Sequence, residues 1–158
     1  MDMVIRSLTA ILFACMVPSA FAQGLSLTIG NTVAAGGAPA VKSLQFIFRL
    51  NGCADLSKAK VAATAEGLVA NGRKTVTLTP LAVTSQPGVY AIGDRWGTDG
   101  TWVVAIGADC ADATTGAIVQ MNARSFVRDG TRFFSHAPTP AEIETALQAY
   151  ASPVSVPR

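Results

Sequence analysis

The sequence predicts an all-β fold, an Ig-like antiparallel β-sandwich of about seven or eight strands followed by a short C-terminal helix. Three observations support this prediction. Apolar and polar residues alternate in several short runs, the pattern of a strand with one buried face. Turn-forming residues recur between these runs at intervals of roughly 8–12 residues, as they do in sandwiches. No regular alternation of strands with helices and no repeat of fixed period is present.

An export signal precedes the predicted domain. Arg6 supplies a positive charge, an apolar run extends from Leu8 to Val17, and Ala20-Phe21-Ala22 offers small residues around a cleavage site. The apolar run is shorter than the roughly 20 residues that span a bilayer. An uncleaved N-terminal anchor is the alternative. We therefore expect cleavage after Ala22, which leaves a mature chain of 136 residues (158 minus 22) beginning at Gln23.

The predicted organisation has three segments: a signal peptide at 1–22, a β-sandwich domain at 23–138, and a C-terminal helix and tail at 139–158. The mature length is close to that of one ordinary domain. The mature chain keeps eleven Lys and Arg against nine Asp and Glu, a net charge of +2. This charge is too small to favour nucleic acid or an anionic membrane as a partner. We expect a periplasmic or secreted protein with no stable membrane anchor after cleavage.

Eight runs are predicted as strands. Most of them alternate apolar and polar residues, which predicts one buried face. The run 102–106 is apolar throughout, which predicts a central strand covered on both faces. In chain order the runs are 25–29, 44–50, 60–66, 74–79, 89–92, 102–106, 117–127 and 131–134.

Turn-forming residues separate these runs. Asn71-Gly72 predicts a hairpin between the third and fourth runs, and Asp129-Gly130 predicts another between the last two. Gln86-Pro87-Gly88 places Pro and Gly as a type II turn prefers them. Gly67 follows the third run.

The C-terminal segment has a helical pattern. Thr139-Pro140-Ala141-Glu142 is a capping box with Pro at the first helical position. Ile143, Leu147 and Tyr150 then follow at the spacing of one helix face, and Pro153 ends the helix. A helix of about three turns is unstable alone, so we expect it to dock on the sandwich. A free tail is the alternative.

The two cysteines of the mature chain are predicted to form a disulfide. Cys15 leaves with the signal peptide, and its neighbours do not form a lipoprotein box. Cys53 and Cys110 remain, 57 residues apart (110 minus 53), each after an apolar run. Two cysteines in an oxidising compartment pair in one way only. The alternative is a redox pair, which favours the spacing Cys-x-x-Cys that this chain lacks.

Few residues in the mature chain could perform catalysis or bind a metal. His136 and Met121 are its only His and Met, so a metal site built from imidazole or thioether ligands is disfavoured. No Gly-x-Ser-x-Gly elbow and no nucleotide-binding motif occurs. We therefore predict no cofactor, no metal and no catalytic residue. A hydrolase that uses His136 is the alternative.

One stretch resembles a known family. A Gly-x-Tyr run, Gly88-Val89-Tyr90, is followed by a turn and a Gly-x-Trp run, Gly100-Thr101-Trp102. This pattern, over about 25 residues, resembles that of YtkA-like and FixH-like extracytoplasmic domains. The resemblance implies an Ig-like accessory module in which Tyr90 and Trp102 come from adjacent strands. Because the run that contains Trp102 is apolar on both faces, we expect Trp102 to pack in the core beside Tyr90. Such modules are often linked to metal or respiratory-enzyme assembly, but this chain lacks their His and Met ligands.

A candidate binding site lies in the turn between these two runs. Arg95 and Trp96 adjoin each other, and Asp99 follows in the same turn. An exposed Trp beside Arg can anchor a bound partner. The alternative is that Trp96 is a lid over the end of the sandwich, since Trp buries readily.

Taken together, these features favour an exported, non-enzymatic accessory or protein-binding module whose partner is another extracytoplasmic protein. The first alternative is a small-ligand or glycan-binding module that uses the Trp96 loop. The second is a hydrolase of unknown specificity.

Overall fold

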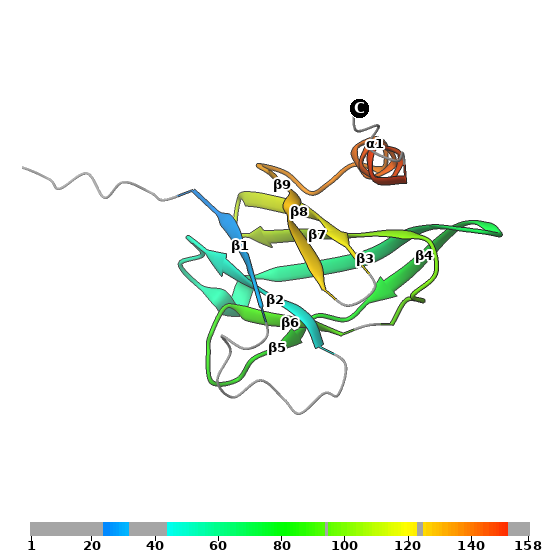
Figure 1. Cartoon of the computed structure of the whole chain (residues 1–158). Coiled ribbons are helices and arrows are strands. Elements are labelled where there is room, and N and C mark those ends of the chain that lie inside the picture. The colour runs from blue at the N-terminus through cyan, green and yellow to red at the C-terminus, as the bar shows by residue number, and fades with distance from the viewer. Residues whose placement is uncertain (1–23, 32–43, 94, 123–124, 152–158) are drawn as a thin grey trace, which may run out of the picture.

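The structure is a computed structural model that describes residues 24–31, 44–93, 95–122 and 125–151. Within these residues the chain forms nine strands, one short 3-10 helix and one α-helix (Figure 1). In chain order the elements are β1 (Ser26–Gly30), β2 (Leu44–Asn51), η2 (Leu56–Lys58), β3 (Lys60–Val69), β4 (Gly72–Leu78), β5 (Leu81–Ala82), β6 (Val89–Gly93), β7 (Thr101–Cys110), β8 (Ala113–Met121), β9 (Phe126–Phe134) and α1 (Pro140–Ala151).

The strands form two antiparallel sheets that pack face to face as a β-sandwich (Figure 1). One sheet has the order β1-β2-β6-β5 and the other the order β4-β3-β7-β8-β9. The predicted all-β sandwich with a short C-terminal helix is confirmed. The described residues contain nine strands instead of seven or eight, because the two-residue strand β5 was not predicted.

The main core lies between the sheets and follows from the alternation along each strand. Phe46 and Phe48 of β2 point inward from the smaller sheet, and Val104 and Ile106 of β7 point inward from the larger one. All four side chains are fully buried. Each buried side chain of this size contributes about 1.5–3 kcal/mol relative to an exposed one, so the apolar alternation is the main source of the sandwich's stability.

β7 is covered on both faces, as its continuous apolar run predicted. Val103 and Ala105 point away from the main core and pack against α1 in a second apolar cluster. α1 contributes Ile143 and Leu147 to this cluster, and both are buried. The predicted helix is therefore confirmed, and it docks on the outer face of the larger sheet (Figure 1).

Two of the predicted turns are confirmed. β3 and β4 form a hairpin in which Val69 pairs with Gly72, so the turn residues are Ala70 and Asn71. After Pro87, Gly88 has a φ of 77° and the Val89 N–H donates to the Gln86 carbonyl at 3.0 Å. This is the geometry of a type II turn.

The prediction of a hairpin at Asp129-Gly130 is wrong. The chain reverses earlier, between β8 and β9, where the Asn122 N–H donates to the Ser125 carbonyl at 2.9 Å. The side chain of Asn122 also accepts from the Ser125 N–H at 2.7 Å. Asp129 and Gly130 lie inside β9, at an irregularity where the pairing with β8 shifts register. The predicted run 117–127 therefore joins the end of one strand to the start of the next.

The third strand is longer than the predicted run, because β3 continues through Gly67 to Val69. Gly67 lies within β3, where it pairs with Trp102 of β7. A Cβ at this position would lie 2.6 Å from atoms of the Trp102 ring. The indole therefore fills the space that a side chain at position 67 would take. It also covers this part of β3, which a glycine without such cover would weaken.

The predicted signal peptide at 1–22 and its cleavage site lie outside the described residues.

Candidate functional site

The candidate binding loop connects the two sheets at one end of the sandwich. It runs from β6 of the smaller sheet to β7 of the larger sheet and contains residues 95–100 among the described ones. Gly100 has a φ of 87°, and the backbone of Leu68 occupies the space where its Cβ would be. The Trp102 indole N–H donates to the Asp99 carbonyl at 2.7 Å. These two contacts fix the loop against β3 and β7.

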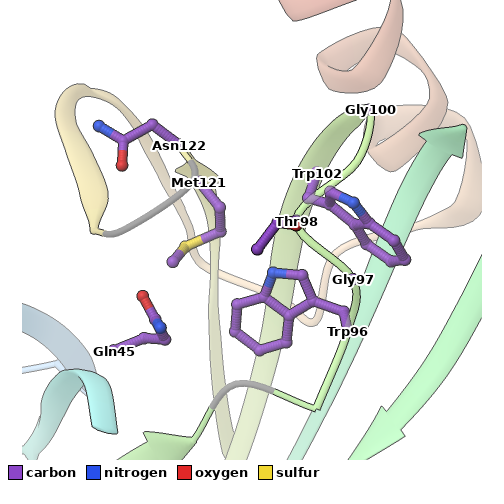
Figure 2. A pocket seen from close by; sticks show the side chains of 8 residues that line it. All are labelled: Gln45, Trp96, Gly97, Thr98, Gly100, Trp102, Met121 and Asn122. Carbon is purple, nitrogen blue, oxygen red and sulfur yellow. The ribbon is translucent and has the colours of Figure 1, made fainter. Parts of the chain in front are cut away.

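Trp96 is half-buried and packs against the main core. Figure 2 shows its ring facing a small cavity, with Gln45 and Met121 on the opposite side. Within this cavity, the centre of a water molecule can occupy a volume of about 30 Å³. Since one water needs about 10–15 Å³ by this measure, the cavity has room for two or three waters at most and for no larger ligand. Trp96 therefore has the position of a lid over the sandwich end.

Asp99 lies in a different place, at a larger groove on the other side of the loop. The groove has a volume of about 380 Å³ by the same measure, within the usual range for small-molecule sites. The structure thus separates Trp96 from Asp99, and Arg95 is exposed and lines neither space. The groove is lined by Val69, Ala70, Asn71, Arg73, Lys74, Gly97, Asp99 and Trp102.

Arg73 is already neutralised by two carboxylates. Its guanidinium contacts Glu66 at 3.3 Å and also pairs with Glu144 of α1. Glu66 is 8% exposed, and it also accepts a hydrogen bond from the Thr75 hydroxyl at 2.7 Å. A buried carboxylate is costly unless it is paired and hydrogen-bonded, so Arg73 is a structural link between the β3–β4 hairpin and α1.

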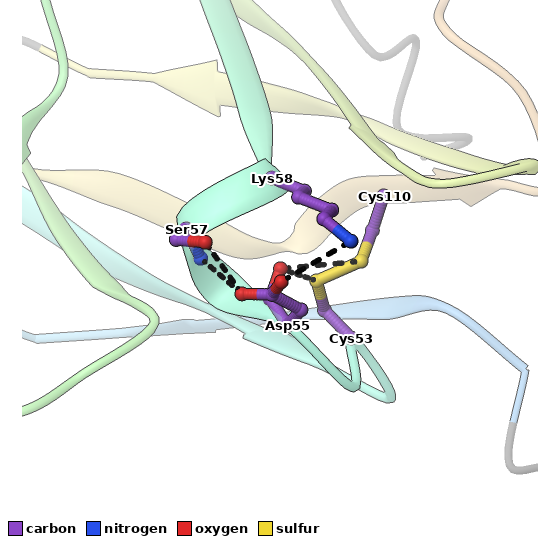
Figure 3. The surroundings of a disulfide bond; sticks show 5 residues. All are labelled: Cys53, Asp55, Ser57, Lys58 and Cys110. Carbon is purple, nitrogen blue, oxygen red and sulfur yellow. Dashed lines mark hydrogen bonds and ion pairs between the residues drawn. A yellow bond between two sulfur atoms is a disulfide. The ribbon is translucent and has the colours of Figure 1, made fainter.

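The predicted disulfide is confirmed, and it joins the two sheets. Cys53 follows β2 of the smaller sheet and Cys110 ends β7 of the larger one, with their Cα atoms 5.7 Å apart (Figure 3). Asp55, in the loop after Cys53, accepts hydrogen bonds from the hydroxyl and backbone N–H of Ser57. These two bonds, the hydroxyl first, lower the pKa of Asp55. Asp55 therefore caps its own turn, as Asp commonly does.

His136 interacts with the cap of α1. Its Nε2 lies 3.0 Å from Glu142 Oε1, and its ring packs at 5.5 Å from that of Phe134. The Glu142 carboxylate also accepts from the Thr139 backbone N–H at 2.8 Å, which is the predicted capping box. The described side-chain contacts of His136 are thus with the N-terminal cap of α1 and with Phe134 at the end of β9.

Phe133 was not singled out from the sequence. It lies on β9, which is an edge strand of the larger sheet, and its side chain is 56% exposed. The adjacent Phe134 points the other way and packs with the second cluster under α1. Two consecutive Phe residues in a strand point to opposite faces, so the pair was a signal that one of them would leave the core.

Tyr90 and Trp102 lie on strands that are consecutive in the chain but belong to opposite sheets. The Tyr90 ring stacks on Phe48 with centroids 5.3 Å apart. Trp102 is 3% exposed and covers Gly67. Both aromatic residues are thus accounted for by packing around the main core.

Comparisons with protein-family models, with curated proteins and with solved structures find no match to this chain. Among the residues that the structure describes, no group of three or more His, Cys, Asp and Glu is placed to hold a metal ion. The same part of the chain has no helix that is long and apolar enough to cross a membrane.

Proposed function

We propose that this protein is an exported, non-enzymatic β-sandwich that binds another extracytoplasmic protein through strand β9. The observation that carries the proposal is the exposure of Phe133. It is 56% exposed and is the one large hydrophobic side chain that lies exposed among the described residues. Aromatic residues are enriched at the centres of protein interfaces. A Phe on an edge strand has no structural need for exposure, so binding is the use that fits it best.

The backbone of β9 supports pairing with an extended segment of the partner. The Phe134 carbonyl accepts a hydrogen bond from the Thr115 hydroxyl on β8, at 3.0 Å, and so points into the sheet. Because backbone groups alternate in direction along a strand, those of Phe133 point to the open edge. An extended peptide can add to such an edge by main-chain hydrogen bonds.

The charges on β9 favour an acidic partner segment. Arg128 and Arg132 are both exposed, and neither makes an ion pair with any described residue. Asp129 is the single acid of the strand. We therefore expect the partner to place an apolar side chain on Phe133 and a carboxylate near Arg132, since complementary charges set specificity at interfaces.

Export is the other part of the proposal. The sequence features at 1–22 favour a cleaved signal, and a structural disulfide persists in oxidising compartments. A periplasmic or secreted location would accommodate both the Cys53–Cys110 bridge and an extracytoplasmic partner.

Site-specific photo-crosslinking tests the interface. A photoreactive phenylalanine analogue at position 133 is compared with the same analogue at Thr77, which is exposed on β4, the opposite edge strand of the same sheet. We expect an adduct with one exported protein from position 133 and none from position 77. The crosslinked peptide should be extended and should contain Asp or Glu.

Affinity for the protein captured in this way then decides the proposal. Phe133→Thr should weaken binding by about tenfold or more, as expected of an interface anchor, while changing the free energy of unfolding by no more than about 1 kcal/mol. Equal adducts from both positions, or undiminished affinity of Phe133→Thr, would overturn the proposal.

A further inference from the structure

We infer that the groove between the β3–β4 hairpin and the loop 97–100 binds a small zwitterion, a molecule that carries both an amino group and a carboxylate, such as a free amino acid. This inference is independent of the β9 interface. It rests on the charges that line the groove, on its size and on its rigidity.

The groove holds two opposite charges that do not neutralise each other. Lys74 and Asp99 both line it. Neither side chain makes an ion pair within 4.0 Å with any described residue, and they make none with each other. The third charged residue, Arg73, is occupied by Glu66 and Glu144. A ligand that enters therefore meets one available ammonium group and one available carboxylate.

The rest of the groove lining is partly apolar. Val69 and Ala70 come from the hairpin, and the indole of Trp102 comes from β7. Asn71 adds an amide that can both donate and accept hydrogen bonds. A ligand with a short aliphatic chain and a charge at each end matches this lining. A purely anionic ligand would face Asp99, and a purely cationic one would face Lys74.

The walls of the groove are fixed in place before any ligand binds. Gly100 sits directly against the backbone of Leu68, and the Trp102 indole N–H holds the Asp99 carbonyl at 2.7 Å. On the other side, Arg73 ties the hairpin to α1 through Glu144. Preformed walls lower the entropy cost of binding. Because Lys74 and Asp99 are both exposed, we expect weak binding dominated by the match of charges.

A series of ω-amino acids tests the inference. Glycine, β-alanine, 4-aminobutyrate and 5-aminovalerate differ in the separation of their charges, while pentanoate and pentylamine carry one charge each. Binding is followed by NMR amide shifts of the uniformly labelled mature protein. We expect at least one member of the series to shift amides of residues 69–74 and 97–99, with an affinity about fivefold or more above that of either singly charged molecule.

Charge-neutral variants assign the two binding groups. Lys74→Gln and Asp99→Asn should each weaken binding of the best ligand by about fivefold, the effect of one exposed charge pair. Lys60→Gln and Asp112→Asn remove the same charges outside both the groove and β9 and should leave binding unchanged. The inference is overturned if no member of the series shifts these amides, if pentanoate or pentylamine binds as well, or if the two groove variants bind as tightly as the unmodified protein.

Discussion

Ala111 has an unusual backbone conformation. Its φ is 51°, and it is the one non-glycine residue with a positive φ in the described part of the chain. It lies with Asp112 in the tight turn between Cys110 and Ala113, the last pair of β7 and β8. Such turns favour Gly where φ is positive, since a side chain there costs about 1–2 kcal/mol.

Replacing Ala111 by Gly should stabilise the protein. The relief of about 1–2 kcal/mol exceeds the entropy cost of a glycine, which is about 0.5–1 kcal/mol, so we expect a gain of roughly 0.5–1 kcal/mol in the free energy of unfolding, measured in urea. The matched control is Ala113→Gly, in β8 with an ordinary φ, which should lose a similar amount. A loss in both variants would show that Ala111 is not strained.

At the residue scale, the sequence indicated which side chains are important better than it indicated where they lie in the fold. The disulfide followed from counting cysteines, because only one pairing was possible. The third predicted run stopped just before Gly67, whereas β3 continues through it, because the indole that covers Gly67 comes from Trp102, which is remote in sequence. Trp96 and Asp99 lie three residues apart in the sequence but line different spaces.

At the scale of elements, α1 begins with an interaction that depends on pH. The Thr139 backbone N–H donates to Glu142 and is the main cause that lowers the pKa of this carboxyl, with His136 adding less. A carboxyl whose pKa is lowered by folding stabilises the folded state above its ordinary pKa of 4.5. That stabilisation is lost as the pH falls through the lowered value.

Glu142→Gln should therefore destabilise the protein in a pH-dependent manner. We expect the variant to be less stable than the unmodified protein at neutral pH, because the charged cap is lost. The difference in the free energy of unfolding should shrink once the pH falls below about 4.5. Urea unfolding of both proteins between neutral pH and pH 3 measures it. A difference that stays constant with pH would contradict the role of the charged carboxylate.

Elements with strong local signals were predicted from sequence, and those set by long-range contacts were not. The capping box and the stripe of Ile143, Leu147 and Tyr150 gave α1 correctly. Asp129-Gly130 was misread because its local signal is that of a turn, whereas tertiary contacts keep the chain extended there. The Gln120 side chain lies where a Cβ of Gly130 would be, and the Tyr150 hydroxyl of α1 donates to the Gly130 carbonyl.

At the scale of the whole molecule, the disulfide connects the ends of two strands in opposite sheets. The bridge closes a loop with a sequence separation of 57 residues. The chain-entropy relation assigns about 4 kcal/mol to a loop of this length. This is a large share of the roughly 5–15 kcal/mol that stabilises an ordinary domain.

Loss of the disulfide should lower the stability by about that amount. We expect the Cys53→Ala/Cys110→Ala double variant to lose roughly 4 kcal/mol in the free energy of unfolding. The slope of its urea dependence should rise, because its unfolded chain is less compact. A reducing agent should produce a loss in the unmodified protein and none in the variant. A loss much below 1 kcal/mol would show that sheet packing alone holds the sandwich together.

We expect the domain to work outside the cytoplasm with the Cys53–Cys110 bridge formed. The most direct test is the intact mass of the protein recovered from outside the cytoplasm, without reduction. We predict a chain that begins at Gln23, cyclised or not, and is lighter by two hydrogens than its fully reduced form. A mass that retains Met1 would show that the chain is not cleaved after Ala22, and a mass that reduction leaves unchanged would show that the bridge is absent.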